Sequence, residues 1–248
     1  MVRKRLIAVL TFNNGVLFRT RNFIPDYRYT FEFVDAWSVD EVVLLDITRP
    51  GKGSRENFFD VVQIFAGNCF VPLTVGGCVK SVDDFRTLLS IGADKVVINT
   101  HAYESPALIS QAAELYGSQC VVVSIDVKFN QNSQYEVFTR FGLNSTGVSP
   151  TKWAMKVQEL GAGEILIQSI DKDGSLEGYD NKLNKSIADA VNIPVLVCSG
   201  AGKWQDFADG FRKGNASAVC TTNIYHFTET SIKSAKQYLN SAGIKVRI

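Results

Sequence analysis

The chain has 248 residues, 46% of them hydrophobic and 21% charged, and its formal net charge is +1. This composition suits a soluble globular protein with a large core, and the near-zero charge gives no reason to expect nucleic acid or a membrane as a partner. Since no apolar run reaches roughly 18 residues, no membrane span is predicted. Five scattered cysteines without a CxxC pair indicate neither a zinc site nor a disulfide framework, which fits a reducing cytoplasm.

Short runs rich in β-branched residues recur along the chain, and amphipathic stretches such as 81–93 and 151–162 lie between most of them. The eight runs cover residues 6–12, 41–47, 71–75, 95–100, 120–127, 164–170, 193–199 and 218–222. This alternation predicts an α/β protein, a (β/α)8 TIM barrel that forms a single domain over residues 1–248. An open doubly wound sheet is the alternative, but the even spacing and the lack of a GxGxxG motif favour a closed barrel.

The chain also contains an internal repeat. Residues 71–103 align with residues 193–225, and Pro72 lies opposite Pro194 at an offset of 122 residues. A repeat of this length predicts a barrel built from two similar half-barrels.

The repeat pairs the ends of two strands that differ in chemistry. Thr11 in VLTF corresponds to Asp126 in SIDV. Because TIM barrels carry their chemistry at the C-terminal ends of the strands, Asp126 is the strongest candidate for an acid or base. The alternative is a capping carboxylate or a salt bridge to Lys128.

Other titratable residues near strand ends are weaker candidates. Asp46 is expected to hold a loop, since the inward alternation passes through Val43 and Leu45. His101 is expected at the rim of the barrel, and His226 is expected to have a packing role.

Glycine and small polar residues follow strands in both halves. The predicted phosphate-binding residues are Gly76, Gly77, Asn99 and Thr100 in the first half and Asp173, Gly174, Gly200, Thr222 and Asn223 in the second. Backbone N–H groups at such turns, followed by a helix N-terminus, favour an anion. The alternative is that the glycines only make tight turns. Two sites at one barrel mouth would suit an elongated ligand with two phosphates.

The opposite end of the predicted barrel carries a second signal. Four charged residues, Arg5, Glu41, Lys95 and Glu164, fall at the starts of strands. Two positive and two negative side chains can close the bottom of the barrel as a ring. The ring is either a structural plug or a gate that admits a small polar molecule from a docked partner.

The segments that contain these residues resemble the HisF family, the cyclase subunits of imidazole glycerol phosphate synthase. The likeness covers nearly the whole chain and is most specific in VDEVVLLDIT, GADKVVINT, GSQCVVVSIDVK and GAGEILIQSIDKDGSLEGYD. It implies a barrel of two halves that docks a glutaminase on its bottom face and passes ammonia through the barrel. It further implies that a two-phosphate precursor is cyclised at the top, and we expect no cofactor.

The resemblance also implies roles for individual residues. It assigns an ammonia gate to Arg5, Glu41, Lys95 and Glu164, glutaminase contacts to Asp94 and Gln119, the first phosphate site to Gly76, Gly77, Asn99 and Thr100, and catalysis to Asp126. These matches leave the predicted ammonia path intact.

The departures from the family pattern cluster at the predicted active end. Thr11 stands where the family has its second catalytic aspartate, and Arg19 replaces a lysine of the following loop. In the second phosphate site, Gln168 replaces a threonine and Ser199 a glycine, while Thr222 and Asn223 replace a small Ala-Ser pair. A hydroxyl cannot act as a carboxylate acid or base, and such a loss typically costs on the order of 10²–10⁴ in rate.

This combination resembles HisF-like paralogues of surface-polysaccharide pathways, which supply ammonia for acetamidino modification of sugars. The expected partners are a HisH-like glutaminase, a sugar amidotransferase and a small phosphorylated ligand. One alternative is a genuine cyclase of histidine biosynthesis, and another is a non-catalytic scaffold that activates the glutaminase.

Overall fold

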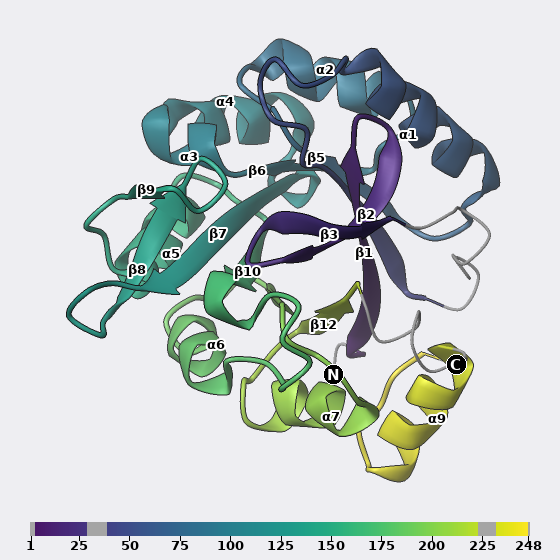
Figure 1. Cartoon of the computed structure of the whole chain (residues 1–248), viewed down its shortest axis with the longest axis vertical. Helices are drawn as coiled ribbons and strands as arrows, with labels where there is room; N and C mark the ends of the chain where they lie inside the picture. Colours follow the sequence, from purple (N-terminus) through teal and green to yellow (C-terminus); the bar gives the residue numbers. More distant parts are fainter. Residues whose placement is uncertain (1–2, 29–38, 223–231, 248) are drawn as a thin grey trace.

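Eight parallel strands close into a barrel (Figure 1) in the structure, a computed structural model that describes residues 3–28, 39–222 and 232–247. The barrel strands are β1 (Arg5–Asn13), β4 (Glu41–Asp46), β5 (Leu73–Gly76), β6 (Lys95–Ile98), β7 (Val121–Phe129), β10 (Glu164–Ser169), β11 (Val195–Cys198) and β12 (Ala218–Thr221). Their order is β10-β11-β12-β1-β4-β5-β6-β7, and pairing of β7 with β10 closes the cylinder. The predicted (β/α)8 barrel is confirmed, and each strand overlaps its predicted run.

Helices cover the outside of the barrel (Figure 1). They are α1 (Glu56–Asn68), α2 (Val82–Ser90), α3 (Thr100–Glu104), α4 (Ala107–Tyr116), α5 (Pro150–Glu159), α6 (Asn181–Ala188), α7 (Trp204–Arg212) and α9 (Ile232–Ser241), with short 3-10 turns at Ser118–Cys120 and Ile170–Lys172. The start of α2 is fixed by a capping box between Ser81 and Asp84. Within the described ranges, no helix combines the length and hydropathy needed to cross a bilayer.

The strands separate two apolar interiors because alternate residues of a strand face opposite sides. The outer core packs strands against helices and contains Phe12, Phe58 and Phe85. The inner core fills the barrel lumen with Ile7, Val9, Val43, Leu45, Val97, Val122, Leu166, Leu196, Cys198, Ala218 and Cys220. An apolar cluster therefore lies in the lumen between the charged end and the mouth.

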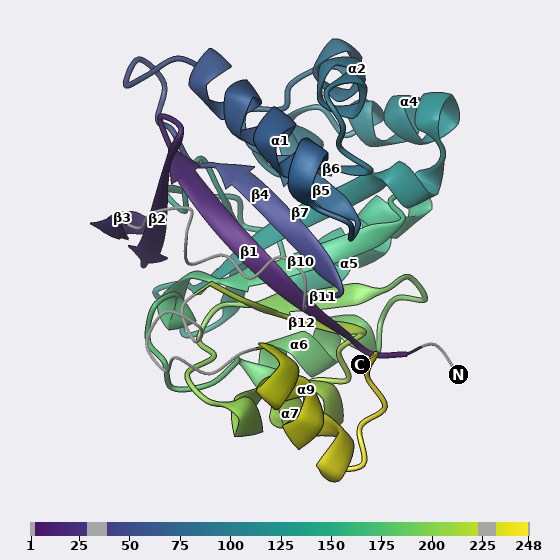
Figure 2. The ribbon, with the colours of Figure 1, turned by 90° about the vertical axis from the view of Figure 1, so that its right-hand side faces the viewer.

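Two hairpins extend equivalent strands beyond the barrel mouth, and the sequence analysis did not predict them. The first consists of β2 (Val16–Arg21) and β3 (Ile24–Arg28), and the second of β8 (Tyr135–Thr139) and β9 (Asn144–Ser145). Figure 2 shows the β2–β3 hairpin projecting from the end of β1. Thr11 pairs with Phe18 of the first hairpin, and Asp126 pairs with Phe138 of the second. The two strand ends thus occupy equivalent places in the two half-barrels.

Candidate functional site

Four charged side chains form a closed ring at the N-terminal end of the barrel. The Arg5 guanidinium lies 2.7 Å from Glu41 and 2.7 Å from Glu164. The Lys95 ammonium lies 3.0 Å from Glu41 and 2.8 Å from Glu164. Each cation therefore contacts both carboxylates. The structure brings these four residues together because each begins or nearly begins its strand, with the side chain turned into the lumen.

The ring is partly shielded from water, so each charged side chain is stabilised mainly by the oppositely charged side chains beside it. Glu41 is 1% exposed and also accepts a hydrogen bond of 2.7 Å from the Thr74 hydroxyl. Burial lowers the pKa of Arg5, but Glu164 and Glu41 outweigh this effect and the net shift is upward. The ion pairs offset the desolvation cost of burying these charges. The ammonia gate itself remains a prediction.

The two residues expected to contact a glutaminase lie at the same end. Asp94 directly precedes β6 and accepts a 2.8 Å hydrogen bond from the Leu73 amide. Gln119 lies just before β7 and donates to the Tyr116 carbonyl at 3.3 Å. Both side chains belong to exposed residues. They are thus placed where a partner covering the ring would meet them.

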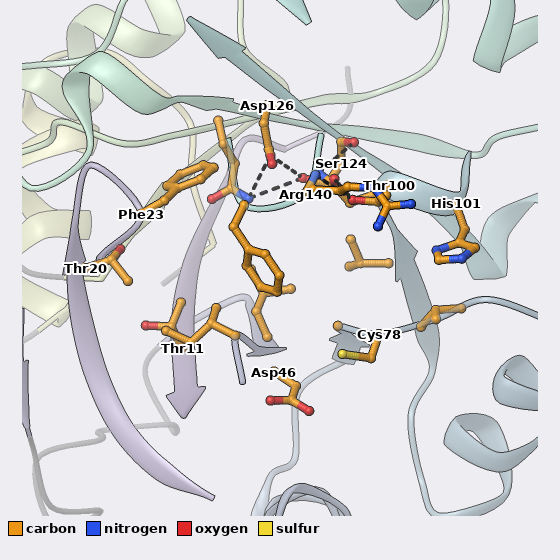
Figure 3. A pocket seen from close by; sticks show the side chains of 18 of the residues that line it. Thr11, Thr20, Phe23, Asp46, Cys78, Thr100, His101, Ser124, Asp126 and Arg140 are labelled. Carbon is orange, nitrogen blue, oxygen red and sulfur yellow. Dashed lines mark hydrogen bonds between the residues drawn. The ribbon is translucent and has the colours of Figure 1, made fainter. Parts of the chain in front are cut away.

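At the opposite end, the C-terminal strand ends surround a cavity of about 240 Å³, here named the mouth pocket (Figure 3). It is lined by Thr11, Thr20, Phe23, Leu45, Asp46, Ile47, Pro50, Gly77, Cys78, Val79, Lys80, Val97, Asn99, Thr100, His101, Ser124, Asp126, Arg140, Phe141 and Gln168. Residues from both half-barrels therefore meet in one pocket, which lies above the apolar lumen.

Among the described residues, Asp126 is one of two carboxylates that line this pocket; the other is Asp46. Asp126 is 5% exposed and accepts hydrogen bonds from the Ser124 hydroxyl at 3.4 Å and from the Gln168 amide at 3.5 Å. Burial raises the pKa of Asp126 to about 7, although hydrogen bonds from Asn99, Ser124 and Gln168 act in the opposite direction. A carboxyl with this pKa can both donate and accept a proton near neutral pH.

Thr11 lies in the same pocket, across from Asp126 (Figure 3), but its hydroxyl is occupied. It donates a hydrogen bond to the Phe18 carbonyl of the β2–β3 hairpin. Arg19, on the same hairpin, contacts Asp26 at 2.8 Å and the ring of Tyr27 and is not among the residues that line the pocket. Neither residue supplies a second acid or base opposite Asp126.

The residues of the predicted first phosphate site are adjacent at one side of the mouth pocket. Gly77, Asn99 and Thr100 line it, and the Thr100 hydroxyl accepts a 3.0 Å hydrogen bond from the Arg140 amide. Gly77 has a φ of +107°, and a Cβ there would lie 2.3 Å from the Asp46 carbonyl oxygen. A Cβ on Gly76 would lie 2.6 Å from the Val97 Cβ. Close packing therefore requires glycine at both positions, whether or not they bind an anion.

The residues of the predicted second phosphate site surround a much smaller space. Asp173, Gly174, Gly200 and Thr222 line a cavity of about 10 Å³, which corresponds to about one water molecule. Asn223 lies outside the described residues, as does His226. Phosphate binding at this site remains a prediction.

The β2–β3 hairpin lies against this small cavity. The Phe23 amide donates to the Asp173 carboxylate at 3.0 Å, and the Asn22 amide donates to the Asp173 carbonyl at 3.3 Å. Burial raises the pKa of Asp173, while the bonds from Phe23 and Thr20 oppose the rise. Asp173 therefore holds the hairpin of the first half-barrel against the second.

Two further carboxylates and one histidine lie near the mouth. Asp46 lines the pocket and accepts a 2.9 Å hydrogen bond from the Thr48 amide, as expected for a residue that holds a loop. Asp171 accepts a 3.0 Å bond from the Phe129 amide. His101 lines the mouth pocket and lies 3.8 Å from Glu104.

Three residues of the mouth pocket were not predicted in this place from the sequence: Phe23, Phe141 and Gln168. Gln168, expected in the second phosphate site, instead donates to Ser124 at 3.2 Å beside Asp126. Phe23 and Phe141 form aromatic walls of the mouth pocket, and both have positive φ angles, +62° each. Asn22-Phe23 and Arg140-Phe141-Gly142 are hairpin turns, and the only sequence signal for the second is its glycine.

The chain is similar to known proteins along its whole length. The family model described as "Histidine biosynthesis protein" matches residues 8–231. Three relatives from Clostridium botulinum, strains Langeland, Kyoto and Okra, are each named "Imidazole glycerol phosphate synthase subunit HisF". Each is 42% identical to this chain over 254 aligned positions that cover 100% of both sequences.

Proposed function

The chain belongs to the histidine biosynthesis protein family, in which it is a HisF homologue, and on this basis we propose that it conducts ammonia from a docked glutaminase to the mouth pocket. The observation that carries the proposal is the order of three features along the barrel: the ring of Arg5, Glu41, Lys95 and Glu164 at one end, the apolar cluster in the lumen, and the mouth pocket with Asp126 at the other end. The proposed partner is a HisH-like glutaminase, since the relatives are named as subunits of a synthase.

The lumen favours the neutral form of the conducted molecule. An ammonium ion would lose its hydration among side chains such as Val43, Val122 and Leu166 without gaining hydrogen bonds, whereas neutral ammonia loses far less. The ring admits the molecule only when at least one ion pair opens. We propose that Asp94 and Gln119 belong to the docking face, since they flank this entrance.

At the exit, the proposed chemistry differs from that of a two-carboxylate cyclase. Asp126 has no acidic counterpart at Thr11, whose hydroxyl is bonded to Phe18. Arg19 is paired with Asp26. We therefore infer that ammonia is used for amidination of a sugar of a surface polysaccharide, together with a sugar amidotransferase, and that cyclase activity is altered or absent.

A second candidate function is the cyclase reaction of imidazole glycerol phosphate synthase. Two observations favour it: Asp126 has a pKa of about 7, and Gly77, Asn99 and Thr100 lie beside it in an open pocket. The 42% identity to HisF subunits agrees with either function.

The deciding experiment combines two assays of the purified protein with a HisH-like glutaminase. The ammonia-conduit function predicts stimulated glutamine hydrolysis but no turnover of the histidine precursor, with either glutamine or added ammonium. Robust ammonium-dependent turnover, or rescue of a histidine auxotroph, would establish the cyclase instead. The Thr11→Asp variant in the same assay shows whether one carboxylate is all that the site lacks.

A substitution in the lumen distinguishes a protein that conducts ammonia from a scaffold that only activates the glutaminase. Val122 is 1% exposed and lines the lumen without lining the mouth pocket, whereas Val97 lines both. Val122→Phe should abolish glutamine-dependent formation of the amidated product, while added ammonium restores it and glutaminase stimulation persists. A scaffold predicts no loss of product.

A further inference from the structure

A second concave surface lies outside the barrel, between the β2–β3 hairpin and the loop that follows β4. We name it the basic groove; its volume is about 420 Å³, and the residues that line it include Arg28, Ile47, Arg49 and Lys52. Arg28 pairs across the hairpin with Phe18, which itself pairs with Thr11. Arg49 and Lys52 are brought together by a turn in which the Lys52 amide donates to the Arg49 carbonyl at 3.0 Å.

Among the described residues that line the basic groove, every charged one is a cation. Within the described part of the chain, neither Arg28 nor Lys52 is in an ion pair, and Arg49 is engaged only with the Phe141 ring, 4.9 Å from its centroid. The nearby Arg19 differs, because Asp26 neutralises it. Three cations that converge on one concavity repel one another, and a bound anion removes that repulsion.

The groove adjoins the mouth pocket. Ile47 lines both, and Arg49 stacks on Phe141, which is a wall of the mouth pocket. A ligand can therefore place an uncharged body against the apolar and aromatic walls of the mouth pocket while an anionic group lies among the three cations. The groove is distinct from the turns at Gly77 and Thr100, neither of which lines it.

We propose that the basic groove binds the diphosphate group of an extended ligand whose uncharged part occupies the mouth pocket. Three cations match the two to three negative charges of a diphosphate ester, and two of them are arginines, whose planar guanidinium groups bind phosphate oxygens in pairs. A single carboxylate or phosphate would leave much of the 420 Å³ unfilled. The proposal rests on the proposed function, since it identifies the class of molecule held where ammonia emerges.

The test measures binding of inorganic pyrophosphate to the full chain by titration calorimetry at low ionic strength. The double variant Arg28→Ala/Lys52→Ala should weaken binding by at least about tenfold, because two charge-assisted contacts are lost. The control Lys152→Ala/Lys182→Ala removes the same charge from exposed positions outside the groove and should change the affinity less than about twofold. An equal loss in both variants would overturn the proposal, as would the absence of pyrophosphate binding to the unmodified protein.

A third variant separates the groove from the turn at the other side of the mouth pocket. Thr100→Val removes a hydroxyl that lines the mouth pocket and should leave pyrophosphate affinity unchanged if the groove is the site. Loss of binding in this variant alone would assign the anion to that turn and overturn the proposal.

Two diphosphate esters identify the source of the group. Uridine diphosphate represents a nucleotide-linked ligand and geranyl diphosphate a lipid-linked one; tighter binding of either than of pyrophosphate supports the proposal, and binding of neither contradicts it. Glutaminase stimulation is measured in parallel with the Arg28→Ala/Lys52→Ala variant. Retained stimulation with no diphosphate binding by any form would reject the groove alone, whereas missing stimulation with intact binding would reject the conduit alone.

Discussion

The two ends of the barrel hold buried carboxylates by opposite means. At the N-terminal end, Glu41 and Glu164 each contact both Arg5 and Lys95. At the mouth, Asp126 receives hydrogen bonds from uncharged donors, and burial raises its pKa to about 7. The ring therefore fixes its charges in place, while the mouth keeps one carboxyl able to change its protonation state. In the proposed ammonia path, the ring lies at the entrance and Asp126 at the exit.

Breaking the ring should have the largest effect on stability. Glu41→Gln leaves Arg5 and Lys95 with one carboxylate between them in a shielded site, so the free energy of unfolding should fall by on the order of 3–5 kcal/mol. Urea denaturation measures this change. The control is Glu159→Gln, whose partner Lys156 lies 3.3 Å away on the surface and whose loss should cost little. Equal losses would show that the ring is no stronger than a surface pair.

Removing the buried carboxylate at the mouth should raise the free energy of unfolding above pH 7, whereas removing one from the ring should lower it. An ordinary aspartate has a pKa of about 4, so a folded pKa of about 7 means that stability falls as the pH rises from about 4 to about 7. Asp126→Asn removes the free-energy cost of ionising this buried carboxyl, and above pH 7 the variant should be more stable by on the order of 4 kcal/mol. Near pH 4 the two proteins should unfold with similar free energies.

A surface aspartate provides the matched control for that pH series. Lys185 and Asn215 lower the pKa of Asp189, so its charged form favours folding. Asp189→Asn should therefore lower stability slightly above pH 4 instead of raising it. A gain in stability in both variants would mean that the effect comes from removing any negative charge and is not specific to Asp126.

Breaking the contact between Asp173 and the β2–β3 hairpin should have a smaller, local effect on the stability of the hairpin. Asp173→Ala removes the acceptor of the Phe23 amide, and hydrogen exchange of that amide should accelerate by about tenfold. Asp26→Ala, which breaks the ion pair with Arg19 on the same hairpin, should leave exchange at Phe23 nearly unchanged. If both substitutions accelerate exchange equally, the hairpin is held by its own residues and not by the second half-barrel.

A substitution at Ser199, near the mouth, should give the smallest change in the free energy of unfolding. The φ of Ser199 is +76°, and its buried hydroxyl oxygen has no hydrogen-bond partner within the described residues. Ser199→Gly should raise the free energy of unfolding by about 1 kcal/mol, since it removes both costs. Ser133→Gly relieves a similar φ of +56° at an exposed serine, so a larger gain at Ser199 measures the cost of the buried hydroxyl. A loss of stability at Ser199 would contradict this account.

The barrel and the position of its charged end could both be predicted from the amino-acid sequence. Strands buried on both faces appear as short β-branched runs, and Arg5, Glu41, Lys95 and Glu164 stand at the starts of four of these runs. The internal repeat likewise identified Asp126 and Thr11 as equivalent positions, which the pairing with Phe138 and Phe18 confirms.

Which of these residues contact one another depends on the folded arrangement of the loops and hairpins. The hairpins escaped prediction because they are short and partly exposed, so burial does not impose a clear hydrophobic pattern on them. Their positions determine that the Thr11 hydroxyl is bonded to Phe18, that Asp173 accepts from Phe23, and that Arg28 meets Arg49 and Lys52 in one groove. Contacts between residues far apart in the chain depend on how loops pack, and local sequence does not encode that packing.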